Sequence, residues 1–308
     1  MVDFQTEAWE AEARIENWGG GSNGGVGLGC WIIEIIWVIL LLKLFKRLQM
    51  EDMEKKRIYS RRYYLSASEC SAQQELGVPA LTEKLIEVAT EHANHLGIGN
   101  PDMPKPDMGW VLSRLTIEMK RYPRENTEYT VTTWVEDWNR HFSRRAFSIS
   151  DSDGTVIGYA RTIWMVLNTK DRSNAGLSQL AFNREWISDR ECPIPMQEKH
   201  TRIAPTPDSA TYRFKYCDID FYRHVNTTRY IALLLNQFSM EEYDRGILGR
   251  LELSFLHEAS YGMDIKIMKN VSESDPHVYQ LYLESADGST PILYSRMRFD
   301  VREGQANG

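Results

Sequence analysis

A single amphipathic helix followed by a run of strands is the feature that most restricts how this chain can fold. The segment "VPALTEKLIEVATEHANHLG" has apolar residues at helical spacing and ends in Gly97, a typical helix stop. Four segments rich in β-branched and aromatic residues follow between Trp110 and Asn168, and "DSDG" predicts a hairpin turn between the last two. This order is typical of an α+β fold with an antiparallel sheet.

The same order of elements returns in the second half of the chain. A strand is predicted up to Tyr216 and a helix from about Val225 to about Phe238, and four more strand segments follow between 249 and 301. The order repeats without repetition of the sequence, which suits an old duplication. Residues 171–208 carry Ser, Asn, Pro and Gly between the halves and predict an extended linker. We therefore expect a first repeat over 53–170 and a second over 209–308.

Composition excludes several classes of protein. The chain has 308 residues and a net charge of −7, which argues against non-specific nucleic-acid binding because phosphate neutralisation needs clustered Lys and Arg. The cysteines form no C-x-x-C pair, so neither a zinc site nor a disulfide framework is indicated, and a reducing cytoplasm fits; they are Cys30, Cys70, Cys192 and Cys217. His92 and His95 lie three apart on the predicted helix, but no third ligand is in view, so we expect no metal.

Residues 1–52 differ in composition from the rest. A Gly-rich stretch leads into an apolar run over 26–45, and basic residues flank its end: Lys43, Lys46 and Arg47. One helix over this run would be about long enough to cross a bilayer, although Glu34 would cost about 2–3 kcal/mol near the centre. The basic flank would keep the downstream residues in the cytoplasm. The alternatives are a membrane anchor and a reading frame that starts at Met50 or Met53.

The densest group of potentially reactive side chains lies between the predicted strand and helix of the second half. Asp220, His224 and Asn226 fall within "DIDFYRHVNTTRYI", on a strand-to-helix turn. The unpaired N–H groups of a helix N-terminus carry partial positive charge and suit an oxyanion. Asp and Asn at such a place are more often caps, so the residues alone leave capping and catalysis both open.

This stretch resembles a known signature. "DIDFYRHVNTTRYI" is similar to the D-x-N-x-H-V-N-x-x-x-Y-I pattern of the acyl-acyl carrier protein (acyl-ACP) thioesterases of plants and bacteria, and "VLSRLTIEMKRYPRENTEYTVTTWVED" resembles their first repeat. The resemblance covers roughly Ile58 to Arg302. It implies two tandem hotdog repeats, each a central helix wrapped by a curved antiparallel sheet. It also implies that the first repeat holds the acyl chain, that the second carries the catalytic residues, and that no cofactor is used.

The resemblance implies three catalytic residues. Glu258, in "LSFLHEASYG", matches the family's Glu at a strand end. Either Glu258 or Asp220 would activate water or attack the thioester directly, and His224 would orient and polarise the carbonyl. Asn226 is expected to cap or brace the turn rather than touch substrate.

Two positions depart from the family pattern. Tyr222 stands where the signature has Asn, so a hydroxyl would have to replace an amide, another side chain would have to take the role, or activity would be weakened. Ala259 stands where plant members carry Cys, which excludes a Cys-His mechanism at that position.

The expected function is hydrolysis of fatty acyl-ACP to free fatty acid and holo-ACP. The alternatives are an acyl-CoA thioesterase and an acyl-binding hotdog protein that has lost turnover. An acidic carrier protein predicts a local basic patch; the candidates are Lys120, Arg121 and Arg124, or Arg140, Arg144 and Arg145. The sequence leaves a homodimer open and favours a cytoplasmic location, membrane-associated if residues 1–52 are genuine.

Overall fold

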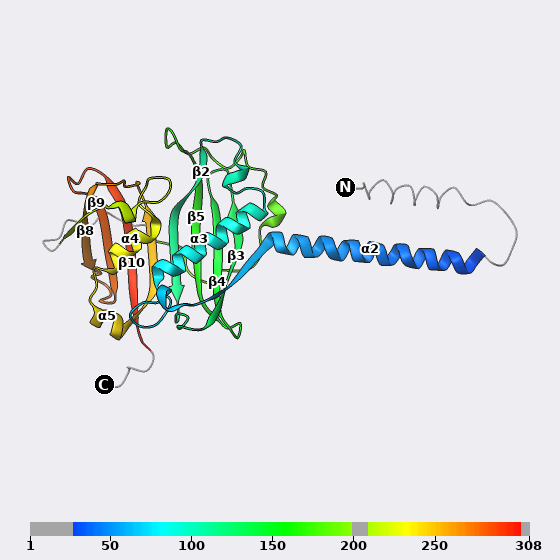
Figure 1. Cartoon of the computed structure of the whole chain (residues 1–308), viewed down its shortest axis with the longest axis horizontal. Helices are drawn as coiled ribbons and strands as arrows, with labels where there is room; N and C mark the ends of the chain where they lie inside the picture. Colours follow the sequence, from blue (N-terminus) through cyan, green and yellow to red (C-terminus); the bar gives the residue numbers. More distant parts are fainter. Residues whose placement is uncertain (1–26, 199–208, 303–308) are drawn as a thin grey trace. The chain divides into compact units, whose positions relative to one another are not determined.

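One continuous sheet contains all ten described strands. The computed structural model describes residues 27–198 and 209–302, and the chain divides into two compact units, Met1–Asp52 and Met53–Gly308. The ten described strands pair in the order β1-β3-β4-β5-β2-β7-β10-β9-β8-β6 (Figure 1). Every pair is antiparallel. The strands are β1 (Ile58–Tyr64), β2 (Met108–Met119), β3 (Glu128–Trp138), β4 (Ser143–Asp151), β5 (Val156–Asn168), β6 (Ala210–Arg213), β7 (Gly246–Phe255), β8 (Asp264–Val271), β9 (Val278–Ser285) and β10 (Pro291–Val301).

The sheet is built from two halves with the same internal order. The first half reads β1-β3-β4-β5-β2 and the second reads β6-β8-β9-β10-β7, so each strand of one half has a counterpart in the other. The halves join where β2 pairs with β7, from Arg114 opposite Ser254 to Glu118 opposite Arg250. In each half a helix follows the first strand, and the second half has a further short helix before its next strand. The predicted α+β class and the repeated order of elements are therefore confirmed.

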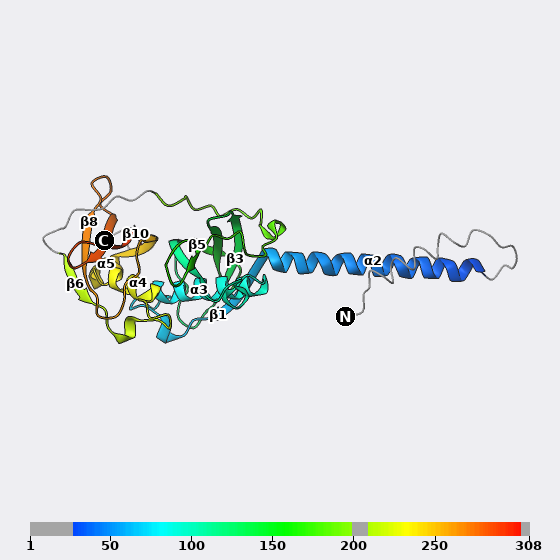
Figure 2. The same ribbon diagram turned by 90° about the horizontal axis from the view of Figure 1, so that it is seen from above.

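Helix α3 (Val78–His95) supplies the central helix of the first half. Gly77 precedes it, Pro79 stands in its first turn, and Gly97 just beyond its end has a φ of 66°, as the predicted stop requires. Its buried residues recur at helical spacing and form one face: Val78, Leu81, Thr82, Leu85, Val88, Ala89 and His92. Helices α3 and α4 lie on the same side of the sheet (Figures 1 and 2) and contact each other. The apolar face of α3 is therefore covered by the sheet.

The second half differs from the sequence prediction near its helices. Strand β6 ends at Arg213 rather than Tyr216, because the chain turns into a 3₁₀ helix (Tyr216–Asp218) that the Asp218 carboxylate caps. Helix α4 (Thr227–Leu235) is shorter at both ends than predicted, because Asn226 caps its start and the chain leaves the helix at Asn236. A further helix, α5 (Met240–Arg245), was not predicted, although the capping box of Ser239 and Glu242 marks its start.

Most of the buried apolar side chains form one large core that runs through both halves, and three smaller clusters are separate from it. The large core joins Leu81 and Leu85 of α3, Ile231 and Leu234 of α4, and the inward side chains of the sheet, such as Phe147. The described part of the predicted linker lies on the first half: Arg161 donates to the carbonyls of Cys192 and Ile194, at 3.0 and 2.7 Å. The linker stretch "APTPD" lies outside the described residues. The linker is therefore partly packed rather than simply extended.

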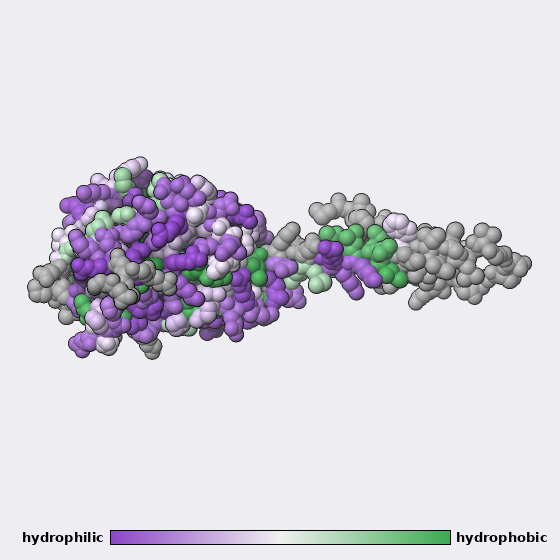
Figure 3. Space-filling model, turned by 90° about the horizontal axis from the view of Figure 1, so that it is seen from below, coloured by the Kyte–Doolittle hydropathy of each residue, from purple (hydrophilic) through white to green (hydrophobic). Residues whose placement is uncertain are grey.

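Helix α2 (Gly27–Arg57) precedes the sheet in the chain. Its large apolar side chains from position 37 onward are exposed to solvent: Trp37, Val38, Ile39, Leu40, Leu41, Leu42, Leu44, Phe45 and Leu48. Apolar and polar side chains both occupy the surface of this helix (Figure 3). Across residues 27–198 and 209–302, no helix combines the length and the apolar character that a membrane crossing needs. The side chains of the predicted apolar run 26–45 lie only in part within the described residues.

Candidate active site

A tight turn carries the reactive side chains predicted ahead of α4. The backbone N–H of Asp220 donates to the carbonyl of His224 at 2.8 Å, and Arg223 adopts a φ of 68° to close the loop. The Asp220 Oδ1 atom accepts from the N–H groups of Tyr222 and His224, at 2.9 and 3.1 Å. One oxygen of Asp220 thus holds the backbone of the turn, as Asp side chains commonly do in loops.

Asn226 caps α4, which is the role predicted for it. Its Oδ1 atom accepts from both the N–H and the hydroxyl of Thr228, each at 3.0 Å, and its carbonyl accepts from the N–H of Arg229. Within the described part of the chain, the N–H of Thr227 has no hydrogen-bond partner. The start of α4 therefore keeps one donor for a ligand oxygen.

His224 and Glu258 meet across the site. Their Nε2 and Oε2 atoms lie 3.4 Å apart, and the two side chains are 36% and 39% exposed. The turn is fastened to the loop after β7 because the N–H of Val225 donates to the carbonyl of Ala259 at 2.9 Å. Two residues far apart in the sequence are thereby brought together at a place that solvent can reach.

Two residues that sequence reasoning missed support Glu258. The Arg172 Nη2 atom contacts Glu258 Oε1, so this carboxylate is held between an arginine and His224. The buried Tyr230 hydroxyl accepts from the N–H of Ala259 at 3.0 Å and fixes the backbone beside Glu258. Burial raises the pKa of Tyr230, and the charges of Glu258 and Asp220 raise it further, so the phenol stays protonated.

The two departures from the family signature occupy different surroundings. Tyr222 is half exposed, and its hydroxyl accepts a hydrogen bond from Asn100 Nδ2 at 3.1 Å. Ala259 is buried, so the position of the plant Cys lies inside the protein here, and the carbonyl of Ala259 accepts from the N–H of Val225, the residue after His224. Tyr222 therefore links the turn to the first half of the chain.

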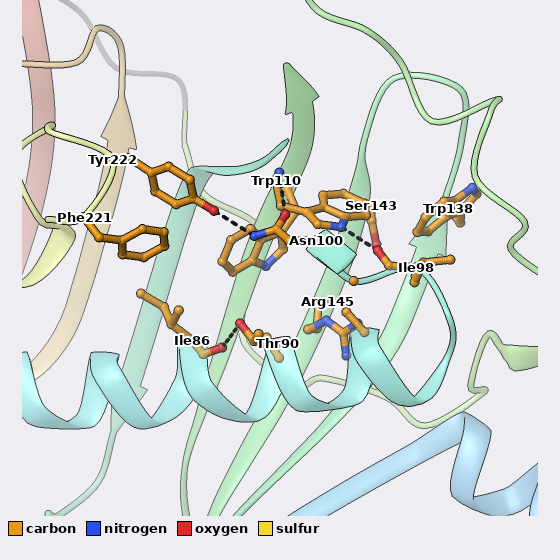
Figure 4. A pocket seen from close by; sticks show the side chains of 14 residues that line it. Ile86, Thr90, Ile98, Asn100, Trp110, Trp138, Ser143, Arg145, Phe221 and Tyr222 are labelled. Carbon is orange, nitrogen blue, oxygen red and sulfur yellow. Dashed lines mark hydrogen bonds between the residues drawn. The ribbon is translucent and has the colours of Figure 1, made fainter. Parts of the chain in front are cut away.

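An apolar pocket of about 270 Å³ begins beside the turn (Figure 4). It lies between α3 and the strands of the first half, and Phe221 and Tyr222 of the turn line one end of it. The apolar lining includes Ile86, Ala89, Ala93, Trp110, Trp138 and Trp164. A pocket of this kind suits a small, largely apolar group.

His92 and Arg145 form a buried contact at this pocket, and the burial of Arg145 corrects its assignment to a surface basic patch. His92 belongs to no metal pair: its Nδ1 atom accepts from Arg145 Nη1 at 2.7 Å, and its Nε2–H donates to the carbonyl of Lys56 at 3.1 Å. Among the described residues, no group of His, Cys, Asp and Glu could hold a metal ion. Arg145 is buried, so it cannot belong to a surface patch, and its neighbour Arg144 already pairs with Glu136.

Acid should weaken the fold through His92. Burial, followed by the charge of Arg145, lowers the pKa of His92 to about 3, so the folded protein binds fewer protons than the unfolded chain between about pH 3 and 6.5. Stability should therefore rise with pH in this window and fall on acidification. We expect wild type to lose about 2 kcal/mol more than His92→Gln between pH 7 and 5 in urea titrations. Equal losses would contradict this, because Gln keeps a donor and an acceptor but does not titrate.

The first half contains the same turn as the second. The N–H of Ser71 donates to the carbonyl of Glu75 at 2.7 Å, and Gln74 adopts a φ of 60°, matching Asp220, His224 and Arg223. The Ser71 hydroxyl accepts from the N–H of Gln73, as Asp220 accepts from Tyr222. Glu75 binds Arg302 instead of facing a pocket. The backbone of the turn thus belongs to the scaffold, and only the second copy carries His224.

Comparisons with known proteins agree with this architecture. Residues 56–179 match the family model described as the acyl-ACP thioesterase N-terminal domain, and residues 204–295 match the acyl-ACP thioesterase C-terminal domain. A palmitoyl-acyl carrier protein thioesterase of Cuphea hookeriana is 24% identical over 82% of this chain and 64% of its own length. The chain thus spans less than two thirds of that plant relative.

Solved structures show the same fold. An acyl-ACP thioesterase from Bacteroides thetaiotaomicron is 30% identical, with a TM-score of 0.74 over 80% of this chain and 99% of that one. The 12:0-ACP thioesterase of Umbellularia californica is 17% identical, with a TM-score of 0.67 over 80% of this chain and 94% of that one. The predicted tandem hotdog fold is therefore confirmed, and the chain belongs to the acyl-ACP thioesterase family.

Proposed function

We propose that this protein hydrolyses the thioester of fatty acyl-ACP and releases free fatty acid and holo-ACP. The observation that carries the proposal is the contact of Glu258 with His224, on the same turn whose Phe221 and Tyr222 line one end of an apolar pocket. Membership of the acyl-ACP thioesterase family supports the same reaction. Thiol release from a panel of acyl-ACP substrates of different chain length tests the proposal, and the absence of release from every substrate would refute it.

In the proposed mechanism, Glu258 acts as the base. A water molecule beside Glu258 loses a proton to the carboxylate as its oxygen attacks the thioester carbon. His224 and the N–H of Thr227 donate to the carbonyl oxygen as negative charge develops on it. The C–S bond then breaks, the thiolate leaves with the electron pair, and it takes up the proton that Glu258 removed from water, which restores the carboxylate. Arg172 and His224 each contact one carboxylate oxygen of Glu258 and so orient it, and direct attack by this carboxylate on the thioester carbon is the alternative mechanism.

We also propose that the first half binds the acyl chain and that the second half carries out the reaction. The pocket in the first half would hold the acyl chain, where each buried methylene contributes about 0.8 kcal/mol, and the turn of the second half would carry the chemistry. We place the boundaries of the halves at 53–170 and 209–308, as predicted from the sequence.

The role of Asp220 can be separated from that of Glu258. Because Asp220 Oδ1 holds two N–H groups of the turn, Asp220→Asn should preserve the turn and Asp220→Ala should lose it. We expect kcat/KM for acyl-ACP to fall about 100-fold in Asp220→Ala but less than about tenfold in Asp220→Asn. An equal, large loss in both variants would instead make the ionised Asp220 carboxylate the catalytic base.

Two alternative functions give different results in the same assay. An acyl-CoA thioesterase would release thiol from acyl-CoA at a higher kcat/KM than from acyl-ACP. A protein that has lost turnover would bind acyl-ACP and release no thiol, and Tyr222→Asn would then test whether the Asn of the family signature restores thiol release.

Docking of the acidic carrier protein is proposed at Lys120, Arg121 and Arg124, although Arg121 also pairs with Asp151.

We further propose that the exposed apolar side chains of α2 associate with a lipid surface. The run from Trp37 to Leu48 is exposed, and Lys43 and Lys46 lie within it, which suits anionic lipid. Co-sedimentation of the full chain with anionic vesicles should therefore be lost in Leu41→Glu. If the chain instead forms a homodimer that this change disrupts, sedimentation velocity without vesicles will show it.

A further inference from the structure

Arg145 is a buried cation without a counter-ion. Its side chain lies in β4, only 4% exposed, and lines the pocket. Nη1 donates to His92 Nδ1 at 2.7 Å and lies 3.4 Å from Thr133 Oγ1; both partners are uncharged, since His92 stays neutral. Within residues 27–198 and 209–302, no hydrogen bond or ion pair involves its Nε or Nη2 atoms. Its positive charge is therefore not compensated by the protein.

The other arginines that the structure describes as buried are compensated. Arg161 makes two hydrogen bonds to the Glu136 carboxylate, at 2.8 and 2.7 Å. Arg250 pairs with Glu118 and Glu252. Burial of an unpaired charge is unfavourable, because the group loses its hydration without gaining an opposite charge. Arg145 is thus the exception among them, and it is the one that faces a pocket.

A second polar group lies on the same face of β4. Ser143 is two residues from Arg145, so both side chains point to the same side of the strand, and both line the pocket. Within the described ranges, the buried Ser143 hydroxyl also has no hydrogen-bond partner. In Figure 4, Ser143 and Arg145 lie at some distance from Phe221 and Tyr222, which come from the catalytic turn. Ser143 and Arg145 therefore place polar groups that lack partners within the described ranges at the part of the pocket remote from the turn, whereas Thr90 and Asn100, which also line it, already donate hydrogen bonds within the protein.

We propose that the pocket binds acyl chains whose far end carries a carboxylate, so that the substrate is the half-thioester of a dicarboxylic acid. This inference rests on the proposed thioesterase function and specifies its substrate class. The free Nε–H and Nη2–H groups of a guanidinium match the two oxygens of a carboxylate, and the Ser143 hydroxyl supplies a further donor. A chain that ends in a methyl group would leave the Arg145 charge unpaired and would bind less well.

The direct test compares matched substrates. At each chain length, acyl-ACP carrying a terminal methyl, hydroxyl or carboxylate group is assayed for thiol release. We expect kcat/KM to be about tenfold or more higher for the carboxylate than for the methyl group at the best length, with the hydroxyl between them. Arg145→Met should invert this order, and Arg145→Lys should keep part of it. A methyl preference in wild type, or a ratio unchanged in Arg145→Met, would overturn the proposal.

Two controls separate this test from folding and from the proposed function. Arg161→Met also removes a buried arginine but lies outside the pocket, so it should leave the substrate ratio unchanged. If Arg145→Met does not fold, Ser143→Ala should still lower the carboxylate preference.

A binding measurement that needs no turnover separates this proposal from the thioesterase function. The melting temperature of the protein should rise more with a dicarboxylic acid monomethyl ester than with the methyl ester of the equally long monocarboxylic acid. If no thiol is released from any substrate but this difference persists, the thioesterase proposal fails while the assignment of Arg145 stands; equal shifts overturn it.

Discussion

Replacement of Glu258 by Gln is expected to lower kcat for thioester hydrolysis by about 10²–10⁴-fold while KM changes little. Gln keeps the size of the side chain and can still accept from Arg172 and His224, but it cannot take a proton from water. The loss should appear in kcat and kcat/KM alike, because the missing interaction is made in the transition state. Steady-state thiol release with a saturating acyl-ACP measures it.

Two further variants make this result interpretable. Glu273→Gln changes an exposed acid between β8 and β9, on the same half of the chain, and should leave kcat within about twofold. His224→Asn should lower kcat strongly, and the double variant with Glu258→Gln should lose much less than the sum of the two effects, because the side chains are in contact. Full activity in Glu258→Gln would show that Glu258 is not the base and would leave Asp220 as the candidate.

Leu234→Ala is expected to lower the free energy of unfolding by about 2–5 kcal/mol, the largest effect on stability among the changes considered. Leu234 is fully buried in the common core, and α4 has only nine residues, so packing rather than intrinsic helix propensity holds it in place. Because α4 begins at the catalytic turn, loosening it should also reduce activity at temperatures below the unfolding transition. Urea unfolding and thiol release on the same preparation test both statements.

The adjacent residue is the control. Leu235→Ala removes the same atoms from a half-buried position on the same helix and should cost clearly less stability. If both variants lose equal stability, the helix depends on its propensity or on local contacts rather than on burial of Leu234. If Leu234→Ala unfolds cooperatively at an unchanged urea midpoint, the core at α4 is not what anchors the turn.

Periodicity alone predicts the strands and the long helix well. β10 begins and ends where "PILYSRMRFDV" does, and α3 ends at His95, just before the predicted stop at Gly97, because alternation and helical spacing reflect burial directly. The errors lie where local polar contacts decide the boundary. The end of β6 depends on the cap made by Asp218, and the ends of α4 depend on Asn226 and Asn236, which spacing does not resolve.

The site was less accessible from sequence than the fold. The pairing of His224 with Glu258 came from resemblance to a family, because no local pattern connects a turn before α4 with a loop after β7. Arg172 gave no signal, since an exposed arginine in a loop usually only solvates a surface. Arg145 was misassigned because "RR" in a strand puts one arginine on each face, and sequence does not say which face is buried.

The pocket and the turn belong to different halves that share one sheet and one chain. Tyr222 of the second half is hydrogen-bonded to Asn100 of the first, and Gln73 of the first is hydrogen-bonded to Asp244 of the second. A site assembled from two separate chains is lost on dilution, because its parts dissociate. Here the covalent link keeps the effective concentration of one half for the other high at any protein concentration, so the specific activity of this site should not depend on how dilute the protein is.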